Sequence, residues 1–206
     1  MVKENDPGKE NTTMKKIVSY IILTMLLMTI GMTMTGCGGS DTSGGGKESA
    51  YTDALAILTT VVGTYTEDDL FAMYGGDQAN AVMDAPGKFD ISKTEELELT
   101  LGLPPEQAER VDDAASIVHL MNGNTFTGAA YHLKDGTDKE DFAQAFKTYT
   151  LGRQWICGQP DTLLVLDVDG SYVITAYGEA ATIELFKNNA LSALAGAQVM
   201  VESPVM

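Results

Sequence analysis

Residues 162–177 read TLLVLDVDGSYVITAY, and this stretch decides the fold class. Two runs rich in aliphatic and β-branched residues flank the dipeptide Asp169-Gly170, which supplies the positive φ angles of a type I′ turn. The sequence therefore predicts a β-hairpin with a two-residue loop. Its apolar side chains alternate between two faces, with Leu163, Val165 and Ile174 expected on one and Leu164, Leu166 and Val173 on the other.

A second hairpin is predicted at Asn122-Gly123, between the β-rich runs 116–121 and 124–133. A helix is expected after each hairpin, over residues 137–149 and about 180–194. The order ββα-ββα indicates an α+β domain with an antiparallel sheet, and leaves open whether the two units are an internal repeat. Because both faces of the hairpins are apolar, the sheet needs cover from helices of this chain or from a second subunit of a homo-oligomer.

N-terminal helices are expected to pack on this sheet. The pattern predicts a helix over 50–65 with Ser49 as its cap, and a short helix from the capping box at 66–69 through Tyr74. Pro104-Pro105 suits the start of a further short helix. Residues 92–101 fit both a helix and a strand, because a capping box precedes three leucines in alternating positions.

The N-terminal segment has the pattern of an export signal. Met14-Lys15-Lys16 precedes the uncharged run 17–34, IVSYIILTMLLMTIGMTM, which leads into Thr35-Gly36-Cys37. Residues 34–37 resemble the lipobox of bacterial lipoproteins. That resemblance implies cleavage after Gly36 and a diacylglyceryl group on Cys37, which would hold the protein on the outer face of the cell membrane.

The predicted domain organisation follows from this leader. Residues 1–36 are the signal peptide, of which 1–13 are expected to lie upstream of a true start at Met14. Residues 37–48 are rich in Gly and Ser and suit a flexible tether, and 49–206 form the folded domain. The alternative is an uncleaved membrane anchor, since eighteen apolar residues can just span a bilayer. We favour cleavage because no basic cluster follows the run.

Charge and cysteine content exclude several classes of protein. From Cys37 onward, acidic residues outnumber basic ones by 26 to 9. Such a surface repels phosphate backbones and anionic headgroups, so we expect no nucleic acid partner and no docking on a membrane by charge. Cys37 and Cys157 are the only cysteines, so a lipidated Cys37 leaves no disulfide within the chain.

The region from about Leu101 to Lys187 resembles a family of small lipoproteins of low-GC Gram-positive bacteria, known as a domain of unknown function. The likeness lies in Leu101-Gly102-Leu103-Pro104 before an acidic helix, the strand 116–121, residues 141–147 and the closing hairpin. The resemblance implies a lipoprotein with an α+β domain. It implies no activity, site or cofactor.

Four motifs invite a chemical interpretation, and each has a simpler structural one. Asp167 and Asp169 resemble the Asp-x-Asp of haloacid-dehalogenase phosphatases, but a second strand follows where that fold needs a helix. His119 and His132 are predicted about 20 Å apart along the hairpin, too far to share a metal. Cys157 has no base placed beside it by the sequence. Residues 135–141 are interpreted as an acidic helix N-terminus rather than a calcium loop.

No catalytic residue, metal ligand or cofactor is therefore predicted. The leading hypothesis is a lipid-anchored, non-catalytic binding or interaction module of the cell envelope, whose protein or small-molecule ligand is not identified by the sequence. The alternative is an envelope hydrolase with a dispersed active site. A concave pocket with converging Asp, His or Cys side chains of perturbed pKa would favour the hydrolase.

Overall fold

The two predicted hairpins lie side by side at the centre of the molecule. The computed structural model describes residues 49–156 and 158–205. β5 and β7 are hydrogen-bonded neighbours, which joins the hairpins into one antiparallel sheet. The four central strands are β4 (Val111–His119), β5 (Phe126–Leu133), β6 (Thr162–Val168) and β7 (Tyr172–Gly178).

Four shorter or peripheral strands extend this sheet: β1 (Met73–Gly75), β2 (Val82–Met83), β3 (Gly87–Lys88) and β8 (Gln198–Pro204). The order is β2-β1-β4-β5-β7-β6-β8, and β3 also pairs with β4, so the described residues form one eight-stranded sheet. β1 and β3 pair with different lengths of β4, because Met73 lies opposite His119 and Gly87 lies opposite Ser116. This edge of the sheet is thus built from short strands and the loops between them.

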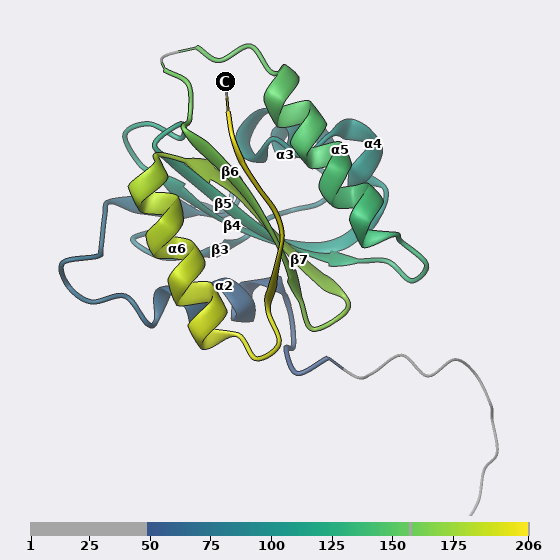
Figure 1. The fold of residues 1–206 in the computed structure, drawn as a ribbon, viewed down its shortest axis with the longest axis horizontal. Coiled ribbons are helices and arrows are strands. Elements are labelled where there is room, and N and C mark those ends of the chain that lie inside the picture. The colour runs from purple at the N-terminus through teal and green to yellow at the C-terminus, as the bar shows by residue number, and fades with distance from the viewer. Residues whose placement is uncertain (1–48, 157, 206) are drawn as a thin grey trace, which may run out of the picture. The chain divides into compact units, whose positions relative to one another are not determined.

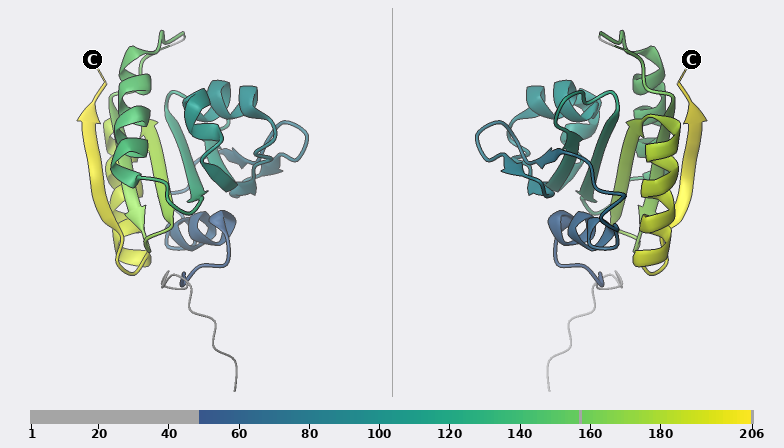
Figure 2. Two further views of the ribbon diagram at one scale, coloured as in Figure 1. Left: turned by 90° about the vertical axis from the view of Figure 1, so that its right-hand side faces the viewer. Right: turned by 90° about the vertical axis from the view of Figure 1, so that its left-hand side faces the viewer.

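Both faces of the sheet are covered by helices of the same chain (Figure 1, Figure 2). One face buries side chains of α3 (Thr94–Leu101), α4 (Pro105–Ala108) and α5 (Lys139–Gly152). The other buries side chains of α2 (Ala54–Val62) and α6 (Ala180–Ala193). The predicted α+β class with an antiparallel sheet is confirmed, and the cover that the sheet needs comes from the chain itself. α5 and α6 lie on opposite faces, and an internal repeat stays a prediction.

The β6–β7 turn differs from the prediction by one residue. Asp169 and Gly170 have the predicted positive φ angles, 47° and 77°. Val168, however, pairs with Tyr172, so three residues rather than two lie between the paired positions. A shift of one residue moves every side chain of a strand to the other face. Val173 therefore packs with Leu163 and Val165, and Ile174 packs with Leu164 and Leu166, the reverse of their predicted sides.

The β4–β5 turn is not the predicted type I′ turn at Asn122-Gly123. Among the described residues, Asp84 and Asp169 are the non-glycine residues with positive φ, and Gly123 is absent from the glycines that have it. The hydrogen-bonded turn lies one residue further on, where Thr125 N–H donates to Asn122 O at 3.0 Å. The predicted register is nevertheless correct, since Asp113 lies opposite His132.

The N-terminal predictions were partly wrong. α2 begins at Ala54 because the Asp53 carboxylate, rather than Ser49, caps it by accepting from Ala56 N–H at 2.7 Å. The capping box at 66–69 closes a turn but starts no helix, and Met73–Gly75 is a strand. Residues 94–101 are helical, which decides between the two alternatives left open by the sequence.

Several predicted features lie outside the described residues. These are the signal peptide, Gly36 and Cys37, the tether at 37–48, and Cys157. None of the helices within 49–156 and 158–205 has the length and apolarity that crossing a bilayer requires.

Candidate functional site

The candidate site is a cleft of about 780 Å³ beside β3, at the edge of the sheet. Its volume is in the range typical of small-molecule sites. Apolar side chains from three elements line it, among them Leu55 of α2, Val82 of β2, and Phe89 and Ile91 after β3. Four aspartates also line it: Asp77, Asp90, Asp112 and Asp113. The cleft therefore combines an apolar lining with a concentration of negative charge.

A β-bulge explains why two consecutive aspartates border one cleft. Successive side chains of a regular strand point to opposite faces. In β4 the register shifts between Val111 and Asp113, so that Asp112 is an extra residue without a partner position on β5. Such a bulge redirects the side chains that follow it. Val111 consequently packs on the α3 and α5 face, whereas both Asp112 and Asp113 line the cleft.

The two aspartates of the bulge have different surroundings. Asp113 is held in place, because its carboxylate accepts from Ala54 N–H at 2.8 Å and lies 3.2 Å from Lys88 Nζ. Asp112 is more open, with 46% of its side chain exposed and His132 Nδ1 2.5 Å from its Oδ1. Of these two aspartates, Asp112 is therefore the one better placed to meet a ligand.

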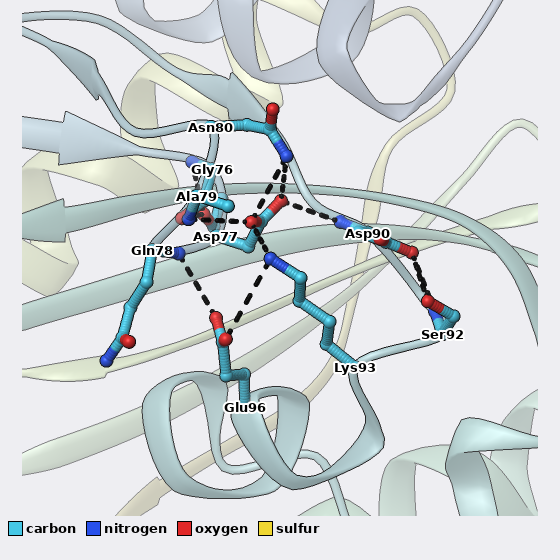
Figure 3. A network of polar contacts seen from close by, with 10 residues as sticks. Gly76, Asp77, Gln78, Ala79, Asn80, Asp90, Ser92, Lys93 and Glu96 are labelled. Atoms are coloured by element: carbon cyan, nitrogen blue, oxygen red, sulfur yellow. Dashed lines mark hydrogen bonds and ion pairs between the residues drawn. The ribbon is translucent and has the colours of Figure 1, made fainter.

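Asp77 organises the wall of the cleft (Figure 3). Its side chain is 1% exposed and forms an ion pair with Lys93, the residue before α3. The same carboxylate accepts hydrogen bonds from Ala79 N–H at 3.0 Å and from the Asn80 amide at 3.0 Å. A longer bond from Asp90 N–H, at 3.3 Å, ties it to the opposite loop. One buried side chain thus joins the loop after β1, the loop after β3 and the start of α3.

These donors fix the protonation state of Asp77. Burial alone would raise the pKa of its carboxyl, but the bonds from Lys93, Asn80 and the backbone outweigh burial and hold the pKa well below its usual value. A general base works best with a pKa near the working pH, and its oxygens must be free to accept a proton. Asp77 meets neither condition, so its role is to hold the loops together.

Acid–base pairing occurs elsewhere at the cleft, between Asp112 and His132. The His132 ring packs against Tyr172 with ring centroids 4.7 Å apart. Within the described residues, its hydrogen-bond partner is the Asp112 carboxylate, and no hydroxyl or thiol donates to it. In the same part of the chain, no group of three or more His, Cys, Asp and Glu residues is arranged to hold a metal ion.

The residues that the sequence singled out lie apart from one another. Asp167 forms an ion pair with Lys139 at 2.6 Å, and Asp169 accepts a hydrogen bond from Ser49 at 3.1 Å. His119 lies at the opposite end of the β4–β5 ladder from His132, where its Nδ1 accepts from Met121 N–H at 3.2 Å. The acidic segment before α5 is the predicted helix N-terminus, and Asp138 caps it.

Sequence reasoning missed the residues that build the cleft. Asp77 lies just after the short helix that was predicted to run through Tyr74, and the sequence predicts no element over residues 79–90. Two- and three-residue strands carry too little periodicity to be recognised. The adjacent pair Asp112-Asp113 in a run otherwise apolar was the one local sign of a bulge.

No family model matches the chain. No curated protein and no solved structure matches it.

Proposed function

We propose that this protein is a lipid-anchored, extracytoplasmic binding protein whose ligand occupies the cleft beside β3. The main observation in support of this proposal is the cleft itself, which has an apolar lining and four aspartates. This combination suits a small ligand that has an apolar body and a cationic group. The apolar body would lie against Val82 and Ile91, and the cationic group would face Asp112.

The charge balance of the cleft supports a cationic ligand. Lys88 is the one basic residue among the described lining residues, and it is already paired with Asp113. Lys93 offsets the charge of Asp77. Asp90 and Asp112 then remain without a lysine or arginine partner within the described residues. A bound cation would lower the repulsion among these carboxylates, which strengthens binding to that class of ligand.

A non-catalytic role is preferred because the buried carboxylate of the cleft is fully used. Asp77 is bonded on both oxygens and kept ionised, which makes it a support rather than a reacting group. The Asp112–His132 pair has no nucleophile beside it among the described residues. A hydrolase would need such a nucleophile within hydrogen-bonding reach of the histidine.

The location is proposed from the N-terminal sequence. A lipid on Cys37 would hold the protein on the outer face of the cell membrane, and the Gly/Ser-rich segment 38–46 would give the domain freedom to reach its ligand. The membrane would be contacted through the lipid, because the acidic domain repels anionic headgroups.

Calorimetric titration with hexylammonium, beside neutral hexanol, tests the cleft. The wild type is expected to bind the ammonium more tightly than the alcohol. Asp112→Asn should weaken ammonium binding about threefold, the worth of a partly exposed ion pair. Asp68→Asn is the matched control, because it removes the same charge from an exposed loop outside the cleft. Equal binding of ammonium and alcohol, or equal losses in both variants, would reject the cationic ligand.

Intact mass and lipid labelling of the membrane fraction test the anchor. The wild type should begin at a diacylated Cys37, and Cys37→Ala should carry no lipid. A wild-type protein that keeps residues 14–36, or that is released without lipid, would show that the anchor assignment is wrong.

A further inference from the structure

Arg153, Lys134 and Lys147 are the described basic residues that form no ion pair with a carboxylate, and of these three Arg153 has a solvent-shielded N–H group without a hydrogen-bond partner. Five other described lysines and arginines form ion pairs with carboxylates: Lys88, Lys93, Arg110, Lys139 and Lys187. Within the described residues, Arg153 forms no such pair. Its Nη2 donates to the Leu99 carbonyl at 2.6 Å, and its guanidinium carbon lies 4.9 Å from the centre of the Trp155 ring. The side chain is therefore positioned by a carbonyl and an aromatic ring, which leave its charge unneutralised.

Arg153 borders a pocket of about 240 Å³ on the α3 face of the sheet. The floor is a row of neighbouring residues on four strands. Tyr74 of β1 pairs with Val118 of β4, Val118 with Thr127 of β5, and Thr127 with Tyr177 of β7. Leu99 near the end of α3 and Arg153 after α5 complete the walls.

The described residues that line this pocket supply the Arg153 guanidinium and two phenols, and no carboxylate. None of the described residues that line it is Asp or Glu, although the chain has 29 such residues against 13 Lys and Arg. Arg153 Nη1 is shielded from solvent and meets no acceptor within the described residues. The Trp155 Nε1 beside it is equally shielded and unpaired. Buried N–H groups without an acceptor are costly, and the cost is greatest for a charged group.

The phenols of the pocket are neutral at physiological pH. Burial raises the pKa of Tyr177, and the Arg153 and Thr127 side chains only partly oppose that effect. Tyr177 O–H donates to the Thr100 carbonyl at 3.1 Å. Burial also raises the pKa of Tyr74, whose hydroxyl forms no hydrogen bond within the described residues. Tyr74 thus offers a free O–H donor on the same floor as Arg153.

We propose that this pocket binds the anionic group of a small organic ligand, a carboxylate or a phosphate, with Arg153 as its charge partner and Tyr74 as a hydrogen-bond donor. A guanidinium presents paired N–H groups that match either anion. The rim is apolar, with Leu99, Leu120 and Met121 exposed by 61%, 42% and 81%. An alkyl or aryl substituent on the anion would cover these side chains. This site is separate from the cleft beside β3 and does not depend on the function proposed for that cleft.

Trp155 reports directly on this pocket, because it is the only tryptophan of the chain and its ring contacts both Arg153 and Tyr177. We would titrate the full-length chain with hexanoate, with hexyl phosphate and with inorganic phosphate, at an ionic strength held constant with chloride. A saturable change of Trp155 emission is expected for the anions and not for chloride alone. The order of affinity among the three probes decides between a carboxylate and a phosphate and shows the contribution of the apolar rim.

Substitutions at Arg153 test the assignment to that side chain. Arg153→Gln should weaken anion binding by about tenfold or more, and Arg153→Lys should restore part of it. Lys147→Gln is the matched control, because it removes one positive charge from α5 outside the pocket. If Arg153→Gln unfolds the chain, anion-induced amide shifts at Tyr74 and Thr127, measured by NMR on the wild type and on Arg153→Lys, serve as the second readout. Emission that does not saturate, an undiminished response in Arg153→Gln, or an equal loss in Lys147→Gln would overturn the proposal.

Discussion

The cleft beside β3 and the Arg153 pocket lie at opposite ends of α3, and they differ in whether their basic side chain is paired with a carboxylate. At the start of α3, Lys93 is paired with the buried Asp77, whose oxygens are fully bonded. At its end, Arg153 binds the Leu99 carbonyl but has no carboxylate partner within the described residues. A buried charge that is completely paired serves the fold, whereas one left unpaired carries a cost that a ligand can relieve.

In each site, some residues hold the surrounding structure together and others face the space for a ligand. In the cleft, Asp77 holds the loops and the more exposed Asp112 faces the space for a ligand. In the Arg153 pocket, the strand residues Tyr74 and Tyr177 form a rigid floor, and the arginine comes from the segment after α5. Trp155 contacts Arg153 and Tyr177 of the second site and no lining residue of the cleft is among its ring contacts, so its emission distinguishes changes in one region from changes in the other.

The largest effect is expected from Gly87→Ala, at the edge of the cleft. A Cβ at this position would overlap the backbone of Gly75 and Gly76, because β1 and β3 pass each other without room for a side chain. Neither backbone can yield while both strands stay paired with β4, so we expect a loss of about 3 kcal/mol in unfolding free energy. Urea denaturation measures this. Gly136→Ala, whose Cβ would meet nothing within 4 Å, controls for a general effect of the substitution, although its φ of 81° adds local strain.

The close backbone contact between Gly75 and Gly87 also explains why some parts of the fold can be predicted from the sequence and others cannot. Hairpins flanked by long β-rich runs, such as 162–177, were recognised because seven-residue strands carry a periodic signal and a turn signal together. β1, β2 and β3 have two or three residues each, and backbone packing at Gly75 and Gly87 holds them rather than any side-chain pattern. Local sequence contains little information about such a contact.

Asp77→Asn is the next test, and it addresses the cleft, where the buried carboxylate is paired with Lys93. The amide retains the shape but cannot neutralise Lys93 or accept from all of its present donors, so we expect a loss of about 2 kcal/mol. Because the folded-state pKa of Asp77 is depressed, its contribution is complete above the unfolded pKa, about 4, and is lost as the pH falls below that value. Wild type and variant should therefore converge in stability as a urea series proceeds from pH 6 to pH 2.5.

Trp155 emission supplies the control for this substitution. If the cleft and the pocket are separate, emission of the folded Asp77→Asn protein matches the wild type, since Asp77 does not border the pocket. A shifted emission maximum would show that α3 transmits the change from one end to the other. The two sites would then not be independent.

The candidate sites were less predictable than the fold because they depend on contacts between distant segments. Asp77 meets Lys93 from 16 positions away, with β2 and β3 between them, and Arg153 meets Leu99 from 54 positions away in the chain. The sequence instead drew attention to Asp167 and Asp169, which are close in sequence and are used for an ion pair and a turn. Spacing along the chain was informative for turns and helix caps, where the partners are neighbours.

Gly102→Ala tests the Arg153 pocket, where the guanidinium has no carboxylate partner within the described residues. Gly102 ends α3 with a φ of 70°, where a side chain is strained, and its Cβ would stand 3.2 Å from Tyr177 Cε1 and 3.4 Å from Arg153 Nη1. We expect a loss of about 1 kcal/mol in unfolding free energy together with a changed Trp155 emission. A lower unfolding free energy with unchanged emission would mean that the backbone strain destabilises the protein but does not displace Arg153.

Tyr149→Phe should have the smallest effect, and it separates the two regions by pH. Tyr149 O–H donates to the Glu98 carboxylate at 2.5 Å, joining α5 to α3 near the Arg153 pocket. Burial, helped by Glu98, raises the pKa of this phenol to about 12. A raised folded-state pKa means that the stabilisation is complete below the unfolded pKa, about 10, and is lost as the pH rises from 10 to 12.

The expected loss at pH 8 is about 0.5 kcal/mol, because the hydrogen bond is partly open to solvent. Between pH 10 and pH 12 the wild type should lose stability more steeply than Tyr149→Phe, while the remaining tyrosines titrate alike in both proteins. Urea midpoints at four pH values in this range measure the difference. The Asp77 variant, in contrast, should run parallel to the wild type here, at a constant difference that shrinks only in acid. Parallel curves for all three proteins in alkali would show that the Glu98 bond contributes nothing to holding α5 against α3, and that the position of Arg153 rests on the Leu99 carbonyl and the Trp155 ring alone.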